Sequence, residues 1–111
     1  MSPRKWESRI QDIIDAIQEI QDYTQGMTYT GFQSDLKTIR AVELNFIITG
    51  EACQAIPEQI QKTEPNIPWH LMRGMRNRIV HAYFSIDPQL VWDTIHNDLP
   101  ILANNLKAML Q

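Results

Sequence analysis

The sequence is poor in cysteine. Of its 111 residues only Cys53 carries a thiol, so neither a disulfide framework nor a thiolate metal cluster can form within one chain. Cys53 lies in an apolar helical pattern, and we expect a buried, reduced thiol.

Long apolar runs are also missing. No run approaches the roughly 18 uncharged apolar residues of a membrane span, and the segment from Met1 to Glu7 lacks the apolar stretch of a signal peptide. We therefore expect a cytoplasmic protein that does not contact a membrane.

The two-residue period of β-strands is missing as well, and no internal repeat or linker stands out. Apolar residues instead recur every three or four positions, as on one face of a helix. The clearest such stripe consists of Trp6, Ile10, Ile13, Ile14, Ile17 and Ile20. With 43% hydrophobic residues, the chain has the size and apolar content of one compact domain. We predict one all-α domain, residues 1–111, folded as an up-and-down helical bundle.

The predicted bundle has four main helices and one short helix. The main helices are expected at about 4–24, 30–56, 68 to between 81 and 84, and 88 to the C-terminus, and the short helix at 57–62. Thr30 and Gln33 have the spacing of a capping box, and Pro57 ends the second helix. Gly50, inside that helix, predicts a close helix contact. Pro100 predicts a kink or a division in the last helix.

Acidic residues are absent between Glu64 and Asp87. The formal net charge of −3 argues against a protein that holds nucleic acid by its overall charge. The acid-free window nevertheless concentrates cations and aromatic rings, namely Trp69, His70, Arg73, Arg76, Arg78, His81, Tyr83 and Phe84. One face of an otherwise acidic protein is therefore expected to be locally basic.

Four residues of this window are candidates for chemistry on a phosphate: Arg76, Asn77, His81 and Tyr83. On a continuous helix Asn77 and His81 share a face, and Arg76 and Tyr83 lie within about 20° of each other. Arg76 and His81 are about 140° apart, so they meet on one ligand only at the helix end or across a dimer.

The reaction that fits these residues is attack of a ribose 2′-hydroxyl on its neighbouring phosphate. Histidine moves a proton near neutral pH, and a guanidinium stabilises charge on the phosphoryl oxygens. Asn77 would orient His81 or hold a phosphate oxygen, and no metal or cofactor is required. Ordinary structural interpretations stand beside this one, with His81 as a cap, the arginines as a solvated face and Tyr83 as a half-buried packing residue.

Other polar and aromatic residues are expected to have structural roles only. We predict that Trp69 and Trp92 pack in the core and that His70 and His96 lie on the surface. Glu43 and Glu51, which might suggest a carboxylate site, are expected to face water or an arginine.

The segment from Arg76 to Tyr83, Arg-Asn-Arg-Ile-Val-His-Ala-Tyr, resembles the R-x4-6-H-x-Y motif of HEPN-domain RNases. Asn77 stands where a polar residue often follows the motif arginine. The resemblance to the HepT-like branch of this superfamily extends over about residues 36–100. It is carried by Arg40–Asn45, Ile48–Ala52, Ile67–Trp69, Gly74–Arg78, Tyr83–Phe84, Val91–Trp92 and Asp98–Pro100.

The resemblance implies a HEPN-like helical bundle that forms a homodimer, with the two motifs facing each other in a cleft. Arg76, Asn77 and His81 would be the catalytic residues of a metal-independent endoribonuclease. Arg73 and Arg78, in the same basic window, are expected to contact RNA.

The resemblance also implies a toxin of a type VII-like toxin–antitoxin pair. The antitoxin would be an MntA-like nucleotidyltransferase that transfers AMP from ATP to Tyr83. An adenylate there would add phosphate charge beside Arg76 and His81 and block the cleft.

Two other functions remain open at this point. HEPN-like domains also serve as noncatalytic nucleotide-binding or dimerisation partners of a nucleotidyltransferase. A helical bundle with no ligand is the third interpretation. The joint presence of Arg76, Asn77, His81 and Tyr83 favours the enzyme, because a scaffold does not require that polar set.

Overall fold

The computed structural model describes residues 5–111, and throughout that range the regular structure is helical, with no strand. The predicted all-α fold is confirmed. The elements are α1 (Trp6–Thr24), α2 (Tyr29–Gln33), α3 (Leu36–Gln54), α4 (Glu58–Lys62), α5 (Trp69–Ala82), α6 (Pro88–Asp93), the π-helical turn η1 (Thr94–Asp98) and α7 (Leu99–Met109).

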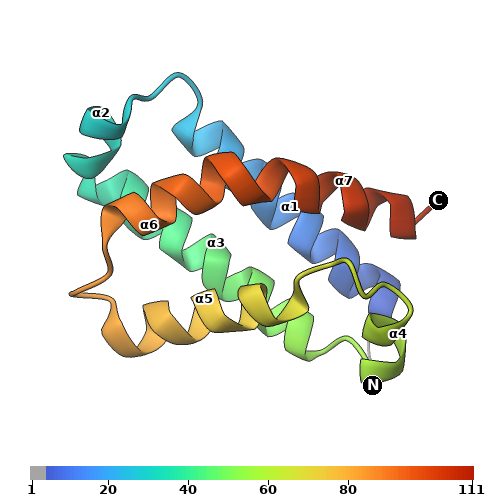
Figure 1. Ribbon diagram of the computed structural model, residues 1–111. Helices are drawn as coiled ribbons and strands as arrows, with labels where there is room; N and C mark the ends of the chain where they lie inside the picture. The colour runs from blue at the N-terminus through green and yellow to red at the C-terminus, as the bar shows by residue number, and fades with distance from the viewer. Residues whose placement is uncertain (1–4) are drawn as a thin grey trace.

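The long elements run up and down, as Figure 1 shows. Helix α3 lies in the middle and packs against α1 on one side and α5 on the other, while α7 packs against α1. The short helices α2 and α4 lie at opposite ends of the bundle (Figure 1). This arrangement leaves the outer side of the α3–α5 pair as an open helix face.

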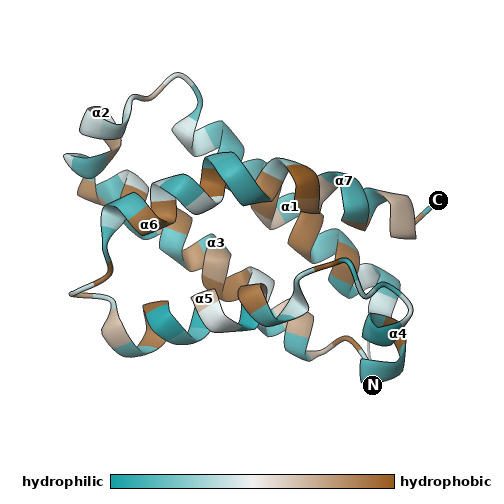
Figure 2. Ribbon diagram, in the orientation of Figure 1, coloured by the Kyte–Doolittle hydropathy of each residue, from teal (hydrophilic) through white to brown (hydrophobic). Residues whose placement is uncertain are grey.

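The core forms where the apolar stripes of the long helices meet. Figure 2 shows these apolar residues in brown along α1, α3 and α7. The fully buried side chains of the core include Ile10, Ile13, Ile17, Ile20, Phe32, Val42, Val91 and Leu106. The isoleucines come from the stripe expected at about 4–24, and that helix is confirmed over Trp6–Thr24. The expected start at residue 4 lies outside the described residues. Trp69 is 6% exposed, and Trp92 packs against the rings of Tyr29 and Phe32, as expected for packing residues.

The single helix expected over residues 30–56 is wrong at its beginning. The chain instead forms α2 and then restarts as α3, because Asp35 caps the new helix by accepting a hydrogen bond from the Thr38 amide at 3.1 Å. The expected capping box at Thr30 is also wrong. Thr28 is the N-cap of α2 and accepts from the Gly31 amide at 3.1 Å.

The last helix is divided, as expected near Pro100. Proline has no backbone N–H, so the ordinary hydrogen bond to the carbonyl four residues earlier cannot form there. The turn before it widens, and the Leu99 amide donates to the Thr94 carbonyl five residues back. Helix α7 then begins with Pro100 in its first turn.

Candidate functional site

The site is built where α3 and α5 come closest, at Gly50 and Arg76. A Cβ atom at Gly50 would lie 2.2 Å from the Cβ and 2.8 Å from the Cγ of Arg76, and 3.0 Å from the Met72 carbonyl oxygen. Only a glycine permits this separation of the two helices. The close contact expected from Gly50 is therefore confirmed, and it fixes the position of the Arg76 backbone and stem.

The guanidinium of Arg76 is held by two neighbours. Its Nε and Nη2 both contact Oε1 of Glu51, at 2.8 and 2.7 Å, and its Nη1 donates to Oδ1 of Asn77 at 2.9 Å. Three of the five guanidinium N–H groups are thus engaged, and two remain for a ligand. The Arg76 side chain is 25% exposed, so that ligand can reach it from solvent.

The two glutamates of α3 behave as expected, each facing an arginine. Glu51 pairs with Arg76, and Glu43 accepts a hydrogen bond from Arg40 at 2.6 Å. Glu43 is 4% exposed, so this partner compensates a buried carboxylate. The role of Glu51 beside Arg76 was not predicted, because a spacing of 25 residues gives no local signal.

His81 and Tyr83 lie in the last turn of α5 and are exposed. Helix α5 is continuous from Arg76 to Ala82, so His81 is about 7.5 Å along the axis and about 140° around it from Arg76. One chain therefore does not bring these two side chains together. Asn77 contacts Arg76, which makes it a neighbour that orients the cation.

Beyond Arg76 the outer side of the helix pair is apolar. Five large side chains there are exposed, and we call them the α3–α5 apolar face: Leu44 (58%), Ile48 (40%), Val80 (37%), Tyr83 (47%) and Phe84 (84%). Because α3 and α5 are antiparallel and Glu51 lies against Arg76, Ile48 is level with Val80 and Leu44 with Tyr83. The Tyr83 and Phe84 rings lie 4.1 Å apart. The exposure of this face was not predicted from the sequence: Val80 was expected on the apolar stripe of its helix, and Leu44 and Ile48 fall beside the stripe of α3.

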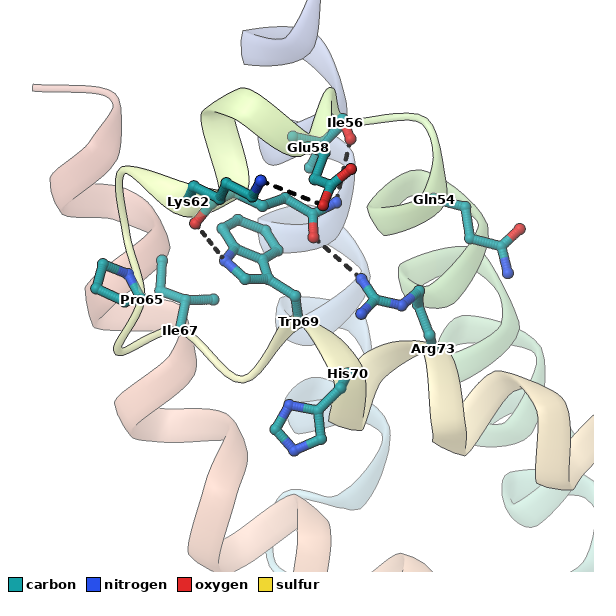
Figure 3. Close-up of a pocket in the computed structure, with 10 residues that line it drawn as sticks. Gln54, Ile56, Glu58, Lys62, Pro65, Ile67, Trp69, His70 and Arg73 are labelled. Carbon is teal, nitrogen blue, oxygen red and sulfur yellow. Dashed lines mark hydrogen bonds and ion pairs between the residues drawn. The ribbon is translucent and has the colours of Figure 1, made fainter.

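In the opposite direction from Arg76, toward α4, the surface is hollowed and lined by both polar and apolar side chains. The hollow, which we call the α4 hollow, has a volume of about 640 Å³ and is lined by Gln54, Ile56, Glu58, Gln61, Lys62, Pro65, Ile67, Trp69, His70 and Arg73. Figure 3 shows the Arg73 guanidinium reaching from α5 toward α4. Arg73 lies one helical turn from Arg76 and so extends the same surface.

Arg78 lies on a different side of α5 from Arg73 and Arg76. It follows Arg76 by two residues, which places it about 200° around α5. It lines a separate groove of about 410 Å³ between α5 and the α6–α7 helix, together with Leu71, Met75 and Asp98. The structure therefore brings Arg73, but not Arg78, to the side of Arg76.

Cys53 is buried and free, as expected. Burial raises the pKa of its thiol, and the nearby positive charge of Arg73 opposes this effect. Nη1 of Arg73 lies 3.7 Å from the Cys53 Sγ.

Within residues 5–111 no group of three or more histidines, cysteines, aspartates and glutamates is arranged to hold a metal ion. In the same range, no helix has both the length and the apolar character to cross a membrane.

Comparison with known proteins places the chain in a family. The family described as "Ribonuclease HepT-like" matches residues 13–109. The chain belongs to the HepT-like family. A HepT-like relative from Thermococcus cleftensis, named "Probable ribonuclease HepT", is 34% identical over 106 residues, which are 96% of each chain. Another, from Methanocaldococcus jannaschii and named "Putative RNase", is 34% identical over 98 residues, 88% of this chain and 78% of the relative. No solved structure matches the chain.

Proposed function

We propose that this HepT-like protein is a metal-independent endoribonuclease. The observation that supports this most directly is the state of Arg76, a cation fixed by Gly50, Glu51 and Asn77. Its side chain is 25% exposed, and two of its N–H donors have no partner in the described part of the chain. A fixed donor pair of this kind stabilises charge on a phosphate oxygen without reorganisation during the reaction. The names of the relatives as ribonucleases support the same reaction class.

In the proposed reaction the ribose 2′-oxygen attacks the adjacent phosphorus and the bond to the 5′-oxygen breaks. The products are a 2′,3′-cyclic phosphate and a free 5′-hydroxyl. His81 accepts the proton of the 2′-hydroxyl or donates one to the departing oxygen. Arg76 stabilises the phosphoryl oxygens, and Asn77 keeps Arg76 in place.

We further propose that the active form is a homodimer joined through the α3–α5 apolar face. Arg76 and His81 of one chain point in different directions, and a second copy across this face supplies the missing partner. Leu44, Ile48 and Val80 give such a contact its hydrophobic centre. Tyr83 and Phe84, at the C-terminal end of α5, would lie at its rim, where Tyr83 stays accessible. Arg73 would contact RNA beside the cleft, while Arg78 can contact RNA only outside it.

We also propose that the protein is a toxin that is neutralised at Tyr83. We propose that an MntA-like nucleotidyltransferase, the antitoxin of a type VII-like pair in the cytoplasm, transfers AMP from ATP to the tyrosine. The Tyr83 oxygen attacks the α-phosphorus of ATP, the phenolic proton is lost and pyrophosphate leaves. The side chain is 47% exposed, and its hydroxyl has no hydrogen-bond partner in the described part of the chain. The added phosphate would occupy the cations that hold substrate.

The test is cleavage of total cellular RNA by the purified protein in excess EDTA. Wild type is compared with Arg76→Ala and His81→Ala, and His96→Ala serves as a matched control because His96 is an exposed histidine on η1. We expect cleavage by wild type and the control, and at least a 100-fold loss in the two motif variants. Equal cleavage by all four proteins would refute the proposal.

Mixing two inactive variants tests the shared site. A heterodimer of Arg76→Ala and His81→Ala contains one complete site if each site takes Arg76 from one copy and His81 from the other. Activity should therefore return after the variants are co-refolded. If both residues act within one chain, the mixture stays as inactive as its components.

A noncatalytic function has one observation in its favour, namely that Glu51 already neutralises Arg76. In that case the chain would be a nucleotide-binding or dimerisation partner of a nucleotidyltransferase. It would bind that enzyme or its nucleotide while leaving RNA intact, with Tyr83 unmodified by mass spectrometry.

A further inference from the structure

The α4 hollow begins one helical turn from the Arg76 site, at Arg73 on α5 and Gln54 on α3. Arg76 and Arg73 are one turn apart on α5, and the matching turn of α3 carries Glu51 and then Gln54. The Cα atoms of the two arginines are therefore about 4.5 Å apart along the helix axis, and both side chains reach partners on α3, Glu51 for Arg76 and Cys53 for Arg73. Stacked nucleotides advance by about 3.4 Å each, so one or two nucleotides cover this distance.

The position of Arg73 is set by Gln61. The Gln61 side chain donates from Nε2 to the carbonyl oxygens of Cys53 and Ile56, at 3.0 and 3.1 Å. Its Oε1 then accepts from Arg73 Nη1 at 3.0 Å. Both ends of the amide are used, so α4 anchors the arginine in the hollow. Figure 3 draws the Arg73 guanidinium with a dashed line to its partner on α4.

Arg73 differs from Arg76 in its charge balance. Arg76 is paired with a carboxylate, whereas the partners of Arg73 within residues 5–111 are the neutral amide of Gln61 and the thiol of Cys53. The other two charged residues that line the hollow, Lys62 and Glu58, pair with each other at 3.5 Å and are both exposed. The cationic charge of Arg73 is thus fixed and uncompensated.

We propose that the α4 hollow binds the RNA nucleotide next to the cleaved one, with Arg73 contacting the flanking phosphate. The proposal rests on the ribonuclease function and adds a substrate subsite to it. The hollow is of the size that small-molecule sites usually have, roughly 300–1,000 Å³, and Gln61 positions its cation. His70, exposed on the first turn of α5, borders the same hollow.

The experiment uses short RNA oligonucleotides in which one phosphate at a time is replaced by an uncharged methylphosphonate. Replacement of the flanking phosphate should lower kcat/KM of the wild type by about 10-fold, because one charge-assisted contact is lost. In Arg73→Gln the same replacement should have little further effect, because the contact is already lost. Arg73→Lys should restore part of the sensitivity.

Arg78→Gln is the matched control, since it removes the same charge from the other side of α5. It should leave the methylphosphonate penalty at its wild-type size. Penalties of equal size in wild type and Arg73→Gln at every phosphate would overturn the subsite. So would loss of ATP binding in Arg73→Gln with unchanged binding of RNA, which would assign the hollow to a free nucleotide.

The subsite can be tested even if the protein does not cleave RNA. Binding of 2′-O-methyl oligonucleotides, which lack the attacking hydroxyl, is measured with the same replacements and variants. A flanking-phosphate penalty that disappears in Arg73→Gln supports the subsite without cleavage. Absence of cleavage together with this binding pattern would refute the ribonuclease proposal alone.

Discussion

One carboxylate oxygen of Glu51, Oε1, contacts both Nε and Nη2 of Arg76, at 2.8 and 2.7 Å. This contact crosses from α3 to α5 and fixes the plane of the guanidinium. It also places a negative charge beside the cation that we propose for phosphate binding. Glu51 therefore has two opposing effects on an RNA substrate, because it orients Arg76 and competes with the phosphate for it.

Replacing Glu51 should separate these two effects. In Glu51→Gln the competing charge is gone, so RNA should bind more tightly and KM should fall. The guanidinium is then less firmly oriented, and kcat should fall by about 10-fold, as expected for a misplaced catalytic group. Steady-state kinetics on a defined RNA measure both parameters, and a kcat at or above the wild-type value would contradict a positioning role for Glu51.

Gly50→Ala should destabilise the protein. The added Cβ meets the Arg76 stem at 2.2 Å and the Met72 carbonyl at 3.0 Å, so α3 and α5 must move apart, at a cost of about 1–3 kcal/mol. Urea unfolding measures the change. Gly74→Ala is the control, because nothing lies within 4 Å of a Cβ there, and it should stabilise α5 by about 0.5–1 kcal/mol. Equal effects of the two substitutions would argue against a close contact at Gly50.

Ile48→Arg should convert the proposed dimer into a folded monomer. Ile48 is exposed on the α3–α5 apolar face, and a buried, unpaired charge at its centre opposes association. Sedimentation at micromolar concentration measures the mass, and RNA cleavage should be lost with the dimer. Ile101→Arg is the control on α7, where the side chain is 64% exposed. Dimers that persist in Ile48→Arg would exclude this face as the interface.

The Cys53 thiol should make stability depend on alkaline pH. Folding raises its pKa through burial, so the folded state holds the proton more tightly than the unfolded state. Its contribution is complete below the ordinary thiol range near 8.5 and declines as the pH rises above it. The destabilisation caused by Cys53→Ala, measured by urea unfolding, should therefore be smaller at pH 10 than at pH 7. An equal difference at both values would show that the thiol titrates normally.

Much of the fold was predictable because helices are encoded locally. The isoleucine stripe predicted α1, and Pro57, Pro68, Pro88 and Pro100 marked boundaries at which a backbone N–H is missing. The break between α2 and α3 was missed because Phe32, Leu36 and Ile39 keep a helical spacing across it. The cap that divides them depends on which way the Asp35 side chain turns, and a pattern of apolar residues does not contain that information.

The sequence by itself determined the all-α fold and the resemblance to the HepT-like family, since these follow from local periodicity and from residues close together in the chain. Side-chain chemistry also predicted Arg76 and His81 as the residues that act on a phosphate. Only the tertiary structure decided their relationships. It pairs Glu51 with Arg76 and hydrogen-bonds Gln61 to Arg73. It also puts Arg78 on the other side of α5 from these two arginines. The physical reason is the antiparallel packing of α3 and α5 at Gly50, which sets the register between residues far apart in the chain.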